Sequence, residues 1–303
     1  MKYKVIIILL LVIPTIILSC STNNKRRAEK SFILPDSLED VPSQLHEEAM
    51  AGIIGNLASP VEVAAMLNEL GVPFYQQLPA STKKVNTLQT NFEKALALGA
   101  LGADLGYLNI YNKNTRIIDY ISSIKYLTDE LNVGQFFDFN TLKRLCENKH
   151  MLDSLMFQSV YSFNQMNTFL EKTGRRNTST LVVTGLWLEG FYIATQISKS
   201  DPKPELIESI GEQKIILKDL FSLLENYEDD STFKELYQSL ENLTKIYEGV
   251  EITYETGEPE TFENENGMLE IIQNEKSIVH ISIDQVESII KETEKIRNQF
   301  INL

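Results

Sequence analysis

No proline occurs between Pro79 and Pro202, and this stretch of 122 residues is the feature that most restricts the fold. Across it, apolar side chains recur at intervals of three and four residues, which is the spacing of one face of an α-helix. Proline interrupts helices, so its absence leaves long helices possible over the whole stretch. The sequence therefore predicts a mainly α-helical fold, a multi-helix array or bundle.

Capping signals and apolar stripes divide the chain into helices. Ser59-Pro60-Val61-Glu62 has the pattern of a helix start, and the short helix that it opens should end at Gly71. The segment 179–199 is apolar nearly all round, so we expect it to lie at the centre of the array. The further helices are expected at 83–111, 114–131, 141 onward, 151–173, 179–199, 205–226, 231–249 and, after a Ser282 cap, 283–300.

The pattern changes after residue 249. Residues 250–254 alternate between apolar and polar side chains, as do parts of 268–272 and 278–281. This period of two predicts a small β-hairpin or a three-stranded flap, inserted at 250–281. We therefore expect one helical domain over 59–303 that contains a β insertion.

Negative charge is concentrated in the same region. The chain has 42 acidic and 28 basic residues, a net charge of −14, and residues 225–276 hold 15 of the acidic and 3 of the basic ones. This balance repels phosphate backbones, so we expect no nucleic-acid partner. The acidic C-terminal third is typical of a solvated surface. The alternative functions of this surface are docking of a basic protein partner and binding of Ca²⁺. Four glutamates are concentrated at the tip of the insertion: Glu258, Glu260, Glu263 and Glu265.

The signatures of common enzymes are missing from the sequence. No Gly-x-Ser-x-Gly, Gly-Lys-Ser/Thr or His-Glu-x-x-His motif occurs. The three histidines, His46, His150 and His280, are far apart in the chain, which argues against a zinc site. We therefore expect no metal and no cofactor, and no catalytic residue can be assigned.

Two short stretches each place one carboxylate in an apolar, glycine-rich helix. The first is Gly102-Ala103-Asp104-Leu105-Gly106-Tyr107, and the second is Gly185-Leu186-Trp187-Leu188-Glu189-Gly190-Phe191-Tyr192. In both, a tyrosine follows the acid by three residues, so acid and phenol share one face of the helix. An unpaired buried charge is costly, so each acid needs a partner or a raised pKa.

These stretches allow three interpretations. The acids can belong to a structural hydrogen-bond network that includes Tyr107, Tyr192 and either Arg116 or Lys125. They can line a ligand pocket, or they can act as paired carboxylates of an enzyme in an inter-helix pocket. The candidate pocket residues are Asp104, Tyr107, Trp187, Glu189 and Tyr192.

The two stretches together resemble sequences in a group of helical lipoproteins of Bacteroidota that have no assigned activity. The likeness covers residues 50–200. It implies a helical fold and attachment to the cell envelope, and it implies no activity, cofactor or site residue.

The N-terminus is typical of a lipoprotein. Lys2 and Lys4 precede an apolar run of 14 residues, which as a helix reaches about 21 Å and is too short for a hydrocarbon core of roughly 30 Å. The run ends in Ile17-Leu18-Ser19-Cys20, which resembles the bacterial lipobox. The resemblance predicts a signal peptide over 1–19, acyl chains such as palmitate on Cys20, and a tether over 20–58. The acidic export tag of surface lipoproteins is missing after the cysteine, which favours the periplasmic side of the outer membrane.

The sequence thus predicts a lipid-anchored periplasmic protein that binds a ligand or scaffolds a partner without catalysis. Its expected partners are the membrane, through the lipid anchor, and a protein at the acidic C-terminal third. The alternative is a hydrolase-like enzyme that uses Asp104 and Glu189 as paired carboxylates.

Overall fold

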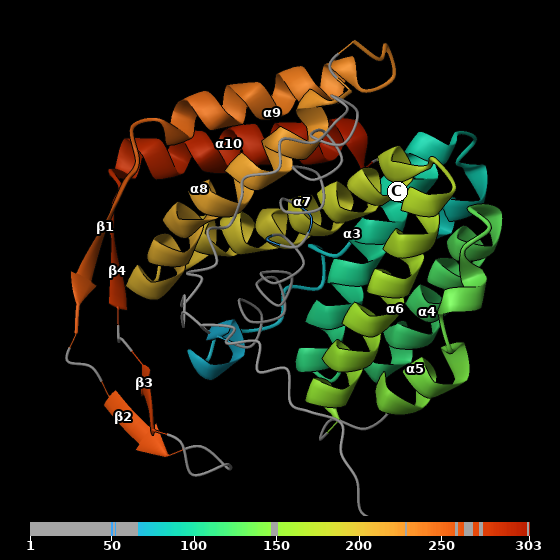
Figure 1. Cartoon of the computed structure of the whole chain (residues 1–303), viewed down its shortest axis with the longest axis horizontal. Helices are drawn as coiled ribbons and strands as arrows, with labels where there is room; N and C mark the ends of the chain where they lie inside the picture. The colour runs from blue at the N-terminus through green and yellow to red at the C-terminus, as the bar shows by residue number, and fades with distance from the viewer. Residues whose placement is uncertain are drawn as a thin grey trace, which may run out of the picture. The chain divides into compact units, whose positions relative to one another are not determined.

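A computed structural model of the chain describes residues 50, 52, 66–146, 151–227, 229–257, 260–263, 269–272, 275–301 and 303 (Figure 1). These residues belong to a compact unit that spans 39–303. The predicted signal peptide, Cys20 and the predicted tether, apart from residues 50 and 52, lie outside the described residues. Within the described part of the chain, no helix has the length and apolar character needed to cross a membrane.

The prediction of a mainly α-helical array is confirmed. The order of helices after the first described turns is η1 (Thr82–Thr87), α3 (Asn91–Ile110), α4 (Asn114–Glu130), η2 (Gly134–Phe136), α5 (Phe139–Cys146), α6 (Leu152–Lys172), α7 (Arg176–Ser200), α8 (Pro204–Glu225), α9 (Lys234–Tyr247) and α10 (Ile283–Phe300). Helix α7 contacts α3, α6, α8 and α10, and most of its side chains are buried. Its nearly continuous apolar surface is therefore covered on several sides, as the sequence predicts for 179–199.

The prediction of one continuous helix over 83–111 is wrong. The chain forms η1 and then leaves the helical path before α3 begins at Asn91. The reason is a capping box, in which Glu93 N donates to Thr90 Oγ1 (3.1 Å) and Thr90 N donates to a Glu93 carboxylate oxygen (2.9 Å). These reciprocal bonds satisfy the free amides of a new helix start, so α3 is a separate helix.

Two glycines let α3 and α7 approach each other closely. A Cβ atom on Gly99 would lie 1.9 Å from the carbonyl oxygen of Val182, and one on Gly185 would lie 2.1 Å from that of Leu96. No side chain larger than hydrogen fits at such distances, so the glycines set the spacing of the two backbones. Asp104 and Glu189 follow these glycines by about a turn of each helix.

The predicted β insertion is present as an extended ribbon (Figure 1). Strand β1 (Glu251–Thr256) pairs antiparallel with β4 (Glu275–His280), and β2 (Glu260–Glu263) pairs antiparallel with β3 (Leu269–Ile272). The insertion is thus a hairpin lengthened by a second ladder, rather than a three-stranded flap. We call strands β1–β4, with their connections, the β-ribbon. The side chains of the tip glutamates Glu258, Glu260, Glu263 and Glu265 lie outside the described part of the structure.

Candidate functional site

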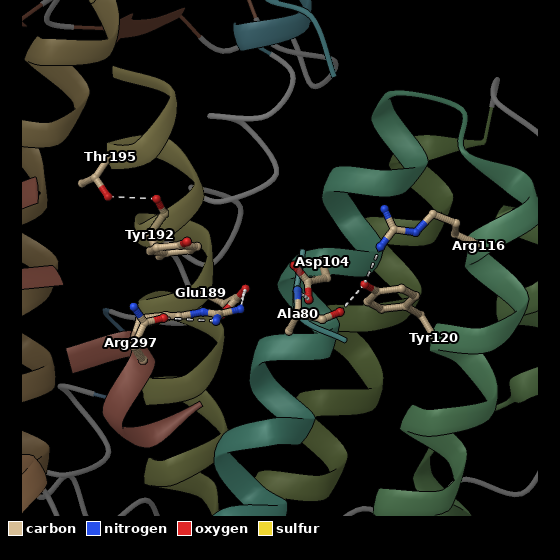
Figure 2. Close-up of polar contacts among 9 residues, drawn as sticks. Ala80, Asp104, Arg116, Tyr120, Glu189, Tyr192, Thr195 and Arg297 are labelled. Atoms are coloured by element: carbon tan, nitrogen blue, oxygen red, sulfur yellow. Dashed lines mark hydrogen bonds and ion pairs between the residues drawn. The ribbon is translucent and has the colours of Figure 1, made fainter. Parts of the chain in front are cut away.

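The structure brings the two predicted acids together between α3 and α7 (Figure 2). Asp104 lies on α3 and Glu189 on α7, and both side chains are 0 % exposed. They lie close enough for the charge of Glu189 to raise the pKa of Asp104. The acid pair is therefore one electrostatic unit rather than two separate buried charges.

Glu189 is neutralised by an arginine from the last helix. Arg297 on α10 donates from Nε to Oε2 of Glu189 (2.9 Å) and from Nη2 to Oε1 (2.8 Å). The same guanidinium lies over the ring of Tyr192, 4.7 Å from its centroid. Burial raises the pKa of Glu189, and the hydrogen bonds and charge of Arg297 oppose that shift. This bidentate geometry is typical of an ionised carboxylate paired with a guanidinium.

Asp104 has a different environment. Its Oδ2 accepts a hydrogen bond from the backbone N–H of Ala80 (2.9 Å), whereas its Oδ1 has no hydrogen-bond partner among the described residues. Burial raises the pKa of Asp104 well above its ordinary value, and the charge of Glu189 raises it further. Arg297, the Ala80 amide and Arg116 oppose these shifts without cancelling them. The folded protein therefore favours the neutral form of Asp104 more than the unfolded chain does.

Ala80 belongs to residues 72–81, which we call the strap because its backbone is bonded to side chains of two helices. Tyr107 on α3 accepts from the Tyr75 amide at its hydroxyl (3.0 Å), and the hydroxyl of Tyr111, the residue that follows α3, donates to the Val72 carbonyl (3.0 Å). The rings of Tyr107 and Tyr111 also pack on each other, with centroids 5.0 Å apart. Helix α3 thus holds the strap near both of its ends.

Helix α4 holds the strap from the other side (Figure 2). Arg116 donates to the Gln76 carbonyl (3.0 Å) and to the Tyr120 hydroxyl (3.3 Å), and the Tyr120 hydroxyl donates to the Ala80 carbonyl. Lys125 takes no part, since it pairs with Asp129 at the surface (2.7 Å). Both polar groups of the Ala80 backbone are therefore bonded, one to Asp104 and one to Tyr120.

Trp187 lies away from the acids. Its Nε1 donates to Gln213 Oε1 on α8 (2.9 Å), and its ring stacks on Phe191 with centroids 5.0 Å apart. Three of the predicted candidates, Asp104, Glu189 and Tyr192, therefore meet around Arg297. Tyr107 is linked to this group through the strap, and Trp187 is not part of it.

Sequence reasoning missed Arg297 and Ala80 as partners of the acids. A signal for Arg297 exists, because it continues the buried stripe of α10 formed by Val286, Ile290 and Thr293. A charged residue at such a helix position indicates a buried partner. No comparable signal marks Ala80, whose contribution is a backbone amide.

The arrangement limits the chemistry that this site can perform. Neither carboxylate is exposed, so no substrate can contact the acid pair in this conformation. Among the described residues, no group of three or more His, Cys, Asp or Glu side chains could hold a metal ion. What the site can do is join four helices (α3, α4, α7 and α10) and the strap, and hold or release a proton at Asp104.

Comparison with family models, with curated proteins and with solved structures gives no match to this chain. The resemblance to helical lipoproteins of Bacteroidota therefore stays a prediction. A function has to be argued from the residues of this chain.

Proposed function

We propose that this protein is a lipid-anchored component of the bacterial envelope, facing the periplasm at the outer membrane, that scaffolds a basic protein partner without catalysis. The observation that carries the proposal is the β-ribbon. The N-terminal lipobox pattern supports the location, and the buried acid pair supports a structural rather than catalytic role for Asp104 and Glu189.

The β-ribbon has the properties of a docking element. Strand β1 pairs with β4 and, among the described residues, with no other strand, so its outer edge keeps unpaired backbone groups. A two-stranded ladder is only marginally stable in water by itself, and such an edge favours pairing with another chain. Tyr254 on β1 is 58 % exposed and adds apolar area to this edge.

The register of the ladder places acids on the solvent side. Ile252 pairs with Val279, whose side chain packs against α8 where a Cβ on Gly211 would lie 2.2 Å from it. Side chains alternate along a strand, so Glu251 and Glu255 lie on the opposite face, and both are exposed. Glu251 and Glu255 complement a basic surface, and the net negative charge of the sequence over 250–281 favours the same kind of partner.

Site-specific photocrosslinking in cells tests the proposed docking. A photoreactive amino acid at position 254, on the ribbon, should give a discrete protein adduct. The same group at position 118, on α4, is the control, because Ile118 is similarly exposed (48 %) but lies outside the ribbon. Equal adducts at both positions, or none at 254, would contradict a role of the ribbon in docking.

A charge variant sharpens this experiment. Glu251→Lys together with Glu255→Gln should weaken the adduct at 254, because electrostatic complementarity sets much of the encounter rate. The second change stops at glutamine because Lys276 lies directly opposite residue 255 in the ladder. A lysine there would place like charges side by side.

The location has its own test. Cys20→Ser should move the protein from the membrane fraction to the soluble fraction and abolish labelling by a palmitate analogue. A variant protein that stays in the membrane fraction and keeps its label would refute anchoring through Cys20.

A further inference from the structure

The two oxygens of Asp104 have unequal surroundings. Oδ2 accepts the Ala80 amide, while Oδ1 has no hydrogen-bond partner in the described part of the protein, and the side chain is 0 % exposed. An ionised carboxylate spreads its charge over both oxygens, so the closed strap would leave part of that charge with neither water nor a donor. A proton on Oδ1 removes this charge and leaves the Ala80 bond intact.

The groups around Asp104 compensate a second negative charge only in part. From α7 and α10, Glu189 and Arg297 neutralise each other, and Tyr192 lies against the guanidinium. From α4, Arg116 is engaged with the Gln76 carbonyl and with Tyr120, and from α3 Tyr107 accepts the Tyr75 amide. Burial raises the pKa values of Tyr107, Tyr120 and Tyr192, so these phenols stay neutral.

We propose that closure of the strap (72–81) over α3 and α4 is coupled to the uptake of one proton by Asp104, so that the strap acts as a pH-sensitive latch. The coupling follows from thermodynamic linkage. Lifting Ala80 breaks its bond to Asp104 and admits water to a carboxyl group that the closed strap keeps dry. Because the closed state favours the neutral acid, closing must bind a proton, and rising pH must favour the open strap.

A second hydrogen bond, whose strength does not depend on pH, also holds the strap closed. The Tyr120 hydroxyl bonds the carbonyl of the same Ala80, and a phenol donates this bond over the whole range in which Asp104 titrates. Loss of the Tyr120 hydroxyl should therefore open the strap equally at every pH, whereas loss of the Asp104 carboxyl should remove the pH dependence itself.

Hydrogen exchange of the Ala80 amide tests the proposal in the full chain, purified in detergent. After correction for the intrinsic exchange rate, the opening constant should rise by up to about tenfold per pH unit between mildly acidic and mildly alkaline buffers. Asp104→Asn should abolish this slope. Tyr120→Phe should raise the opening constant at all pH values and keep the slope.

Two controls isolate the latch from general effects of pH. Asp119→Asn removes an exposed acid of α4 and should leave the Ala80 slope unchanged. The Val133 amide, bonded to the Thr128 carbonyl (2.8 Å) outside the strap, should show no slope. A flat Ala80 profile in the parent chain, or a slope that persists in Asp104→Asn, would overturn the proposal.

A direct titration covers the case in which Asp104→Asn does not fold. The carboxyl carbon of Asp104, observed by NMR in the ¹³C-labelled parent chain, should titrate well above the ordinary range of aspartate. Titration at the ordinary aspartate value would overturn the latch independently of any variant.

Discussion

The carboxylates between α3 and α7 differ from those of the β-ribbon in how their charge is accommodated. Asp104 and Glu189 are 0 % exposed. Glu189 accepts two hydrogen bonds from Arg297, whereas Asp104 accepts one from the Ala80 amide and has a raised pKa. Glu251 and Glu255 face solvent, and water hydrates them. The buried acids should therefore govern stability, whereas the exposed acids should govern binding.

The removal of Arg297 should have the largest effect. Arg297→Met leaves Glu189 buried without its cation, and such a loss costs about 3–5 kcal/mol of unfolding free energy. Urea unfolding of the full chain, followed by circular dichroism, measures it.

Two further variants show whether the cost comes from the unpaired charge. Arg297→Met combined with Glu189→Leu should recover most of the loss, because a buried ion pair can often be replaced by apolar residues. Lys125→Met breaks the surface pair with Asp129, where both side chains are more than half exposed, and should cost at most about 0.5 kcal/mol. Similar losses for Arg297→Met and Lys125→Met would remove the distinction between buried and exposed pairs.

The next largest effect should come from the glycines that set the spacing of α3 and α7. Gly99→Ala forces a Cβ to within 1.9 Å of the Val182 carbonyl oxygen, and such overpacking costs about 1–3 kcal/mol or more. Gly102→Ala is the matched control, since its Cβ would lie at an ordinary 3.5 Å from Leu186 Cδ1. Gain of helix propensity should make that variant as stable as the parent or up to about 1 kcal/mol more stable. Equal effects of the two changes in thermal melts would show that the helices can move apart.

Asp104→Asn should give a smaller effect that depends on pH. The pKa of Asp104 is raised in the folded state, so the folded protein binds more protons than the unfolded chain between the two pKa values. Stability at this site is therefore highest at acidic pH and falls as pH rises, by at most about 1.4 kcal/mol per pH unit. Asparagine cannot ionise, so the variant should be more stable than the parent at neutral pH, and this gain should vanish near the ordinary pKa of aspartate.

Glu93 allows a comparison, because its pKa is shifted in the opposite direction to that of Asp104. Hydrogen bonds from the Thr90 backbone lower the pKa of this α3 capping residue. The stability that ionised Glu93 adds is fully present above its pKa in the unfolded chain, and it is lost as pH falls through its lower pKa in the folded protein. Urea titrations of Asp104→Asn and Glu93→Gln across pH should therefore deviate from the parent in opposite directions, and parallel deviations would refute the assignment for Asp104.

Much of the fold follows from local patterns in the sequence. Spacings of three and four residues located the helices, Ser282 with Gln285 caps α10 as expected, and Gly71 ends the first described turns with a positive φ of 71°. The interruption before α3 was missed, although Thr90 and Glu93 have the spacing of a capping box, because the apolar stripe continues across it.

The site could be predicted only in part. Periodicity shows that Asp104 and Glu189 are buried, but it does not identify partners, and Arg297 is 108 residues from Glu189 in the chain. Trp187 could have been separated from the acids, since two residues correspond to about 200° around a helix and place Trp187 opposite Glu189. The strap is held through its backbone N–H and C=O groups, which every residue type has, so the sequence does not show these contacts.

The smallest effect on stability should come from the β-ribbon. Glu251→Lys with Glu255→Gln changes exposed side chains of one strand pair, so the unfolding free energy should change by less than about 1 kcal/mol. The same variant should weaken the photocrosslink at position 254, because each change removes negative charge from strand β1 near that position. Urea unfolding and crosslinking on one preparation separate the two readouts. If stability falls as far as it does in Arg297→Met while the crosslink persists, the ribbon acids are structural, and the division between stabilising buried charge and binding surface charge does not hold for this protein.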